Sequence, residues 1–252
     1  MLLADRNGFA VRGAPTPPPG EYWGLCFTAE AANSTIAMSK NGAPPEVSLV
    51  TSPDGKTWTP FIVGETTITL PAVGDKVYFA AGQSGNTAFA SSNRNYTSFT
   101  LNGSLAASGS IMSLLNATTP IYELTADFAF AYLFLSCSAL VSAPELSAST
   151  LTTSCYQQMF RRCSSLSVGP KIFAESLEPN CFSSTFDGDS SLSWIEVAFT
   201  DWYYNGNLCT VRWLNGVSAT GVFRCPTALG TDATITRSGN LCPTGWTVIN
   251  TD

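Results

Sequence analysis

The chain has 252 residues, of which 44% are hydrophobic, so it is long enough to bury a sizeable core. Only 12% of its residues are charged, which is about half the fraction typical of soluble proteins, so its surface must be made mostly of Ser, Thr, Asn and Gly. It contains no histidine, which excludes Ser-His-Asp and Cys-His catalytic systems and HExxH zinc sites and favours a protein without enzymatic activity, cofactor or bound metal. The net charge of −6 argues against a nucleic-acid partner, and no apolar run approaches the ~20 residues that a membrane-spanning helix needs.

Residues 1–20 form a Pro-rich segment ahead of the first predicted strand. The run from Ala14 to Gly20 contains four prolines and favours an extended, polyproline-like backbone. Asp5 and Arg6 interrupt the stretch where the apolar core of a secretory signal would lie. We interpret residues 1–20 as an arm or linker that contacts other proteins of an assembly; a disordered start is the alternative.

Residues 21–112 are predicted to form an antiparallel, immunoglobulin-like β-sandwich. Short runs rich in β-branched and aromatic residues alternate with turns that contain Gly, Pro, Asn or Asp, as is typical of this architecture. The turn Ser52-Pro53-Asp54-Gly55, followed closely by Trp58, indicates a hairpin. No cluster of titratable residues that points to catalysis occurs in this part.

Residues 113–204 contain an internal repeat with a period of 26 residues. Because one coil of a repeat protein cannot bury its apolar face alone, such positions are expected to stack on their neighbours. Each repeat is expected to have a helical or bent portion followed by a short strand, and residues 205–252 to form a C-terminal cap. The positions expected to form the core of the repeat are Phe134, Phe160 and Phe186, Leu140, Leu166 and Leu192, and Cys137 and Cys163.

The Phe-x-x-Cys-x-x-Leu units that begin at Phe134 and Phe160 resemble the BspA-like (Treponema-type) leucine-rich repeat, of the kind found in gut Bacteroidales and their phages. The segment 143–151 and the tail from Trp213 to Val248 are similar to that family too, so the resemblance covers about residues 120–252. The third repeat departs from the pattern, with Asp189 in place of Cys and Glu196 in place of Pro. The resemblance implies a leucine-rich-repeat solenoid on a surface protein that adheres to proteins, cells or glycans without enzymatic activity.

The arm and the resemblance together predict a virion protein. We expect a phage fibre, decoration or receptor-binding protein on the virion surface, which docks on other virion proteins through residues 1–20 and presents its repeats to a host protein or glycan. Several copies, or a homo-oligomer, would supply avidity. The alternative is an adhesin on the bacterial cell surface.

Candidate contact residues gather where the regular repeat ends, and one basic pair lies inside the repeat. Exposed aromatic rings can stack on sugars or fill protein pockets, although burial as a hydrophobic plug is an equal alternative. For the basic pair, a solvated turn is the alternative to a contact with an acidic ligand. The candidates are Trp194, Trp202, Tyr203 and Tyr204, with Arg161 and Arg162 as secondary contacts.

The eight cysteines include no CxxC pair, which disfavours a zinc ribbon. Cys137 and Cys163 are offset by one repeat, so we expect them to stack as small buried thiols rather than to form a bridge. A disulfide is more strongly expected among the cysteines of the C-terminal part, Cys209, Cys225 and Cys242.

Overall fold

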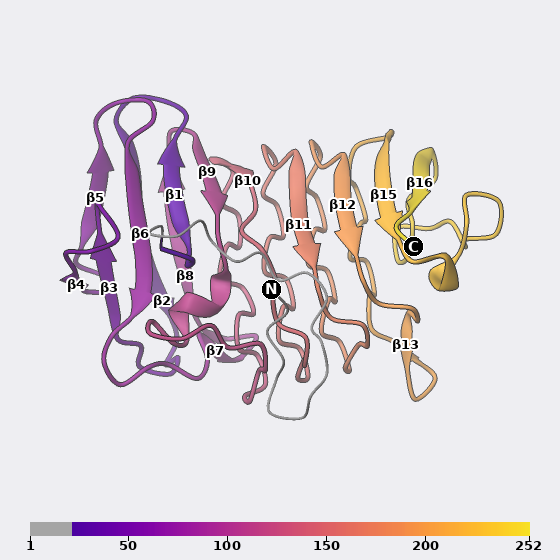
Figure 1. Cartoon of the computed structure of the whole chain (residues 1–252), viewed down its shortest axis with the longest axis horizontal. Helices are drawn as coiled ribbons and strands as arrows, with labels where there is room; N and C mark the ends of the chain where they lie inside the picture. Colours follow the sequence, from indigo (N-terminus) through magenta and orange to yellow (C-terminus); the bar gives the residue numbers. More distant parts are fainter. Residues whose placement is uncertain (1–21) are drawn as a thin grey trace.

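A computed structural model describes residues 22–252, and the predicted arm, residues 1–20, lies outside the described residues. The fold is mainly β and runs from a two-layered N-terminal half into a coil of parallel strands (Figure 1). The strands of the first half are β1 (Cys26–Ala29), β2 (Ser34–Asn41), β3 (Leu49–Ser52), β4 (Thr59–Phe61), β5 (Thr67–Leu70), β6 (Lys76–Ala81), β7 (Ala90–Ser92), β8 (Asn95–Asn102) and β9 (Leu105–Ser108). The second half contains the 3₁₀ helix η1 (Ile111–Leu114), β10 (Leu140–Ser142), β11 (Val168–Ile172), β12 (Trp194–Val197), β13 (Tyr203–Tyr204), β14 (Asn207–Leu208), β15 (Gly221–Cys225), the 3₁₀ helix η2 (Thr227–Leu229) and β16 (Trp246–Asn250).

The N-terminal half is a sandwich of two antiparallel layers. One layer has the strand order β9-β1-β6-β3-β4, and the other has the order β5-β2-β8-β7. Strand β2 alternates buried and partly exposed residues along most of its length, which is the pattern of a strand with one face in a core. Phe27 of β1 and Phe79 of β6 meet Phe99 of β8 edge to face, with ring centroids 5.2 and 5.4 Å apart. Aromatic rings from both layers therefore fill the space between them.

The C-terminal half is a β-solenoid of about four turns, in which each turn contributes one parallel strand. The order β10-β11-β12-β15-β16 is parallel throughout. Strand β10 also pairs in parallel with β9 of the sandwich. One ten-stranded sheet consequently crosses from the sandwich into the solenoid without a break (Figure 1).

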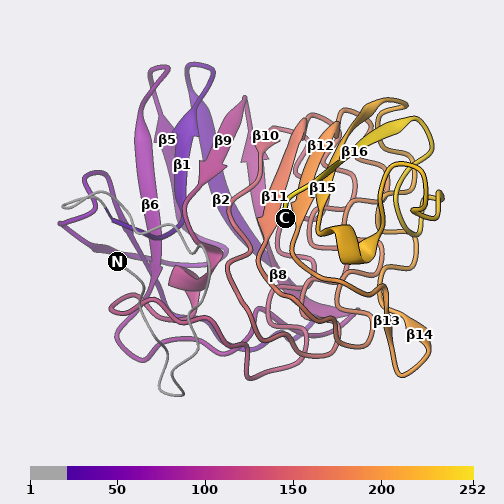
Figure 2. The ribbon, with the colours of Figure 1, turned by 45° about the vertical axis from the view of Figure 1, so that its right-hand side comes forward.

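The wall of the solenoid behind the sheet consists of successive turns rather than helix (Figure 2). The backbone enters the left-handed region at equivalent positions of neighbouring coils, as at Tyr132, Gln158 and Ser184, with φ of 64°, 52° and 55°. Such φ values are uncommon for residues other than Gly, Asn and Asp. The coils compensate with a ladder of backbone hydrogen bonds, in which the N–H of Phe130 donates to the carbonyl of Cys155 (2.8 Å) and that of Tyr156 to Cys181 (3.0 Å). Each repeat is expected from the sequence to contain a helical or a bent portion, and within the described residues this portion is bent and not helical.

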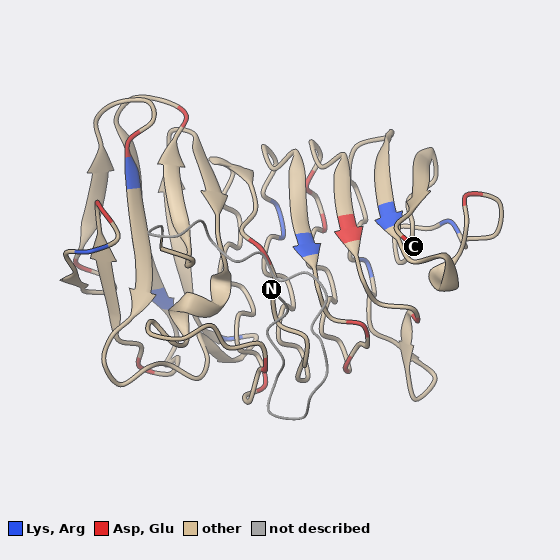
Figure 3. Ribbon diagram, in the orientation of Figure 1, with Lys and Arg blue, Asp and Glu red and all other residues tan. Residues whose placement is uncertain are grey.

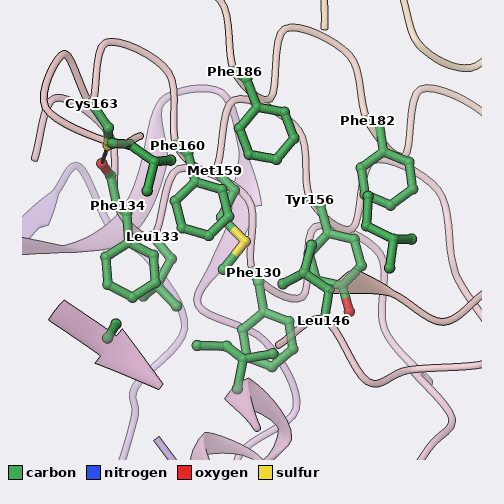
Figure 4. Close-up of a cluster of buried hydrophobic side chains, with 14 of the residues drawn as sticks. Phe130, Leu133, Phe134, Leu146, Tyr156, Met159, Phe160, Cys163, Phe182 and Phe186 are labelled. Carbon is green, nitrogen blue, oxygen red and sulfur yellow. Dashed lines mark hydrogen bonds between the residues drawn. The ribbon is translucent and has the colours of Figure 1, made fainter. Parts of the chain in front are cut away.

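Two columns of stacked aromatic rings form the core of the solenoid (Figure 4). Phe134, Phe160 and Phe186 are fully buried, and neighbouring rings lie 5.2 and 5.4 Å apart with interplanar angles of 6° and 3°. The column begins inside the sandwich, where Phe99 stacks on Phe134 at 5.0 Å. The second column consists of Phe130, Tyr156 and Phe182.

The leucines and cysteines of the repeat lie beside these columns. Leu140, Leu166 and Leu192 are fully buried. The thiol of Cys137 donates to the carbonyl of Phe99 (3.3 Å), and that of Cys163 to the carbonyl of Phe134 (3.0 Å). Each thiol thus satisfies a carbonyl of the neighbouring coil or strand.

All eight cysteines are buried free thiols. The disulfide expected among Cys209, Cys225 and Cys242 is therefore wrong for this structure. These residues fill the interior as small apolar side chains, as Cys137 and Cys163 do.

The solenoid continues beyond residue 204, where the sequence placed the start of the cap. The N–H groups of Phe182 and Phe186 donate to the carbonyls of Cys209 (3.2 Å) and Trp213 (2.8 Å), which extends the ladder by another coil. Strands β15 and β16 extend the parallel sheet in the same way. The segment between these two strands closes the end of the solenoid. Among residues 22–252, no helix is long and apolar enough to cross a membrane.

Candidate binding surface

The outer face of the parallel sheet carries an apolar row that runs across its strands. Val168 of β11 pairs with Trp194 of β12, and Trp194 pairs with Val222 of β15. Trp194 and Val222 are followed in their strands by Ile195 and Phe223, which are fully buried. Because successive side chains of a strand point to opposite faces of the sheet, the apolar row points away from the core. Val168 is 46% exposed. Trp194 therefore lies between two aliphatic side chains on an open β-sheet.

A row of charges lies beside the apolar row on the same face (Figure 3). Glu196 of β12 lies between Lys171 of β11 and Arg224 of β15, with N–O distances of 3.1 and 2.9 Å. The ammonium group of Lys171 also lies 5.0 Å from the centre of the Phe173 ring. Exposed ion pairs add little stability, but these contacts hold one acidic and two basic side chains in fixed positions. We call the two rows together the sheet surface.

Tyr203 and Tyr204 lie on a small hairpin that projects from the solenoid (Figure 2). Strands β13 and β14 are joined by Asn205 and Gly206, whose φ values of 48° and 78° fit a tight two-residue turn. Tyr203 is 48% exposed and Tyr204 is 36% exposed. The hairpin therefore presents two aromatic side chains to solvent.

Trp202 does not share this exposure. Its side chain is buried, and its ring contacts those of Phe199, Trp213 and Phe223 at 5.3, 5.8 and 5.9 Å. For Trp202 the hydrophobic-plug alternative holds, because its indole fills the core at the last coils. The prediction that Trp202 contacts a ligand is wrong in this structure.

Arg161 is engaged within the wall of turns. Its Nε lies 3.1 Å from Oδ2 of Asp187, and a guanidinium nitrogen of Arg212 lies 3.3 Å from Oδ1 of the same carboxylate. Burial raises the pKa of Asp187, but hydrogen bonds from Asn215 and Arg212 outweigh burial, and the pKa is lowered overall. The ionised Asp187 carboxylate thus links neighbouring coils, and the Arg161 guanidinium is already engaged in an ion pair with it. Arg162 is exposed, and within the described residues its guanidinium makes no ion pair.

The structure does not bring the candidate contact residues together. Trp194 lies on the sheet surface, the two tyrosines lie on the hairpin, and the arginines lie on the wall of turns. Sequence reasoning missed Val168, which precedes Trp194 by one repeat period and could have been found from that offset. It also missed the charged row, because Lys171, Glu196 and Arg224 are not separated by a constant interval. Lateral strand pairing alone makes them neighbours.

Within residues 22–252, no group of three or more Cys, Asp and Glu side chains is arranged to hold a metal ion. Comparison of the chain with family models, with curated protein sequences and with solved structures gives no match. The sheet surface therefore has to be interpreted from its own chemistry.

Proposed function

We propose that this chain is a non-enzymatic adhesion protein that binds a host protein or glycan through the sheet surface. The observation that carries the proposal is the row Val168–Trp194–Val222 beside the row Lys171–Glu196–Arg224. A partly exposed tryptophan between aliphatic residues supplies contact area with little loss of side-chain entropy, and charges held in place beside it supply orientation. A flat sheet with both features suits recognition of a surface better than conversion of a small substrate.

The resemblance of the repeats to BspA-like leucine-rich repeats supports the same function, because that family adheres to proteins, cells and glycans. We place the protein on the surface of a phage particle, with residues 1–20 docked on other virion proteins and the immunoglobulin-like sandwich connecting them to the repeats. Several copies per particle would compensate for a modest affinity at each sheet surface.

Replacing Trp194 by Ala tests the sheet surface. We expect binding of the purified protein to host cells to fall by about tenfold, which corresponds to about 1.4 kcal/mol. The matched control is Thr247→Ala, because Thr247 is exposed in the same cross-strand row, next to Val222. Thermal midpoints of both variants should stay close to that of the wild type. Unchanged binding by Trp194→Ala, together with a loss in the double variant Tyr203→Ala/Tyr204→Ala, would move the binding site to the hairpin.

The location of the protein has its own test. Mass spectrometry of purified virions and of bacterial outer-membrane fractions should find the chain in the virions. Detection in the outer-membrane fraction alone would contradict the virion proposal and support the bacterial adhesin.

A further inference from the structure

A concave site lies beside the sandwich strands and shares no residue with the sheet surface. The β3–β4 hairpin and the segments that follow β6 and η1 enclose a groove of about 590 Å³, which we call the sandwich groove. Its volume falls within the range of small-ligand sites. Residues that line it include Tyr22, Trp58, Pro60, Gln83, Ser84 and Asn116.

One side of the sandwich groove is an aromatic platform. Trp58 packs edge to face on Tyr22 with ring centroids 4.9 Å apart. Tyr22 in turn packs edge to face on Tyr78 at 5.9 Å and is tilted against Trp23 at 6.0 Å. These contacts fix the ring of Trp58, which remains partly exposed. A fixed aromatic face attracts the weakly positive C–H groups of a ligand because its own π-face is negative.

The other side of the groove is polar and held in place. Asn86, which directly follows the lining segment, accepts a hydrogen bond from the N–H of Ser48 (2.8 Å) and donates to the carbonyls of Ser48 (2.9 Å) and Leu114 (2.8 Å). This one side chain ties the segment after β6 to both neighbouring segments. Nearby, Oδ1 of Asn116 accepts from the N–H and the hydroxyl of Thr118, both at 3.0 Å. The polar wall is therefore organised before any ligand arrives.

The lining keeps both donors and acceptors free. Among the described residues, the Nε1 of Trp58, the side-chain amide of Gln83 and the Nδ2 of Asn116 make no hydrogen bond. The amide oxygen of Gln83 and the hydroxyl lone pairs of Ser84 and Thr118 are available as acceptors. None of the described lining residues is charged. A ligand that fits must both donate and accept hydrogen bonds, carry no charge and present an apolar face.

We propose that the sandwich groove binds an uncharged saccharide. Sugar hydroxyls donate and accept, and one face of a hexose ring presents C–H groups to an aromatic side chain. A proline-rich peptide also packs on aromatic rings, but its prolyl backbone only accepts hydrogen bonds, which would leave the acceptors of the groove without partners. The site is separate from the sheet surface and does not depend on it.

The test is a titration of the full chain with neutral oligosaccharides built from hexoses and N-acetylhexosamines, and with sialylated counterparts. Binding is followed through the indole N–H resonances in nitrogen–proton correlation spectra. We expect the Trp58 resonance, identified by its loss in Trp58→Phe, to shift with at least one neutral oligosaccharide. Adding sialic acid should not improve binding.

The variants separate a role in binding from a role in folding. Isothermal titration calorimetry measures the variants, because Trp58→Ala removes the reporter resonance. Trp58→Ala should weaken saccharide binding by about tenfold and Gln83→Ala by about threefold to tenfold. Gln83 is exposed and makes no side-chain hydrogen bond among the described residues, so its replacement should leave the thermal midpoint unchanged. Gln157→Ala is the control in the solenoid, because its side chain also makes no hydrogen bond among the described residues, and it should leave saccharide binding unchanged. The proposal is overturned if no neutral oligosaccharide shifts the Trp58 resonance, if Gln83→Ala binds as well as the wild type, or if a peptide of residues 13–20 shifts that resonance in place of the sugars.

Discussion

Asp189 is the residue at which the repeat departs from its own pattern. It stands one period after Cys163, is fully buried, and accepts a hydrogen bond from the N–H of Cys163 at 2.7 Å through Oδ1. Oδ2 is buried and makes no hydrogen bond within residues 22–252. Burial raises the pKa of Asp189 to about 9, the hydrogen bond from Cys163 partly opposes it, and the charge of Asp187 adds to it. The folded protein consequently keeps this carboxyl protonated at neutral pH.

This protonation makes stability depend on pH. Between an ordinary pKa of 3.8 and about 9, the unfolded chain has lost the proton and the folded chain keeps it. The free energy of unfolding contributed by Asp189 therefore falls as pH rises through this range, by up to about 1.4 kcal/mol per pH unit. Asp189→Asn keeps an acceptor for the N–H of Cys163 and has no proton to lose. We expect the variant to gain stability over the wild type at pH 8 relative to pH 5.

Chemical denaturation at pH 5, 6.5 and 8 measures the effect. Glu65→Gln is the control, because Glu65 is exposed and its carboxyl makes no hydrogen bond among the described residues. Equal pH dependence in the wild type and Asp189→Asn would show that the carboxyl is ionised in the folded state.

The coil and its neighbours are the elements that the sequence revealed most directly. The constant offset of Phe134, Phe160 and Phe186 is visible in the sequence, and the structure stacks these rings. The backbone between them was harder to predict, because the spacing of Phe130 and Phe134 suits a helix as well as turns that repeat every four residues. The left-handed φ of Tyr132 lies between them, and nothing in that residue type indicates it. Local spacing thus predicted the core but not the backbone that carries it.

The outer edge of β16, the last strand of the ten-stranded sheet, is covered by an ion pair and not by a further strand. Oδ1 of Asp232 accepts from the N–H of Val248 (2.9 Å) and from Arg237 (2.7 Å), while Arg237 donates to the carbonyl of Trp246 (2.6 Å). These side chains occupy backbone groups that a neighbouring strand would otherwise use. At the opposite edge, Pro60 in β4 lacks an N–H. Both ends of the ten-stranded sheet are therefore poor templates for strand addition.

Removal of the ion pair should make the β16 edge adhesive. We expect Arg237→Ala to associate more strongly with itself than the wild type does, because the carbonyl of Trp246 is then free to pair with another chain. Sedimentation velocity over a concentration series measures this association. Arg94→Ala removes the same charge from an exposed position in the sandwich and should behave like the wild type. A concentration dependence of Arg237→Ala equal to that of the wild type would mean that other parts of the cap protect the edge.

At the scale of the whole molecule, sandwich and solenoid share one sheet and one core. Strand β9 pairs with β1 on one side and with β10 on the other. Phe99 of the sandwich stacks on Phe134 of the first coil, and one continuous cluster of buried side chains runs from Leu25 to Val248. The sequence suggested a boundary near residue 112, because composition and period change there. It could not show the pairing of β9 with β10, since that contact joins segments far apart in the chain.

This continuity predicts that the described fold unfolds as one unit. Phe160→Ala would leave a cavity between two coils and should lower the free energy of unfolding by about 3–5 kcal/mol. In repeat proteins the stability of each coil depends on its interfaces with the adjacent coils. Here the first coil also has an interface with the sandwich, so destabilising one coil should destabilise the sandwich too. A probe in the sandwich, the fluorescence of Trp58 in a variant in which the other tryptophans are Phe, should therefore report the same lowered midpoint as circular dichroism of the whole chain. Trp58 midpoints that stay at the wild-type value while circular dichroism shows an earlier transition would establish two independently unfolding domains. In that case the shared sheet would not couple the solenoid to the sandwich.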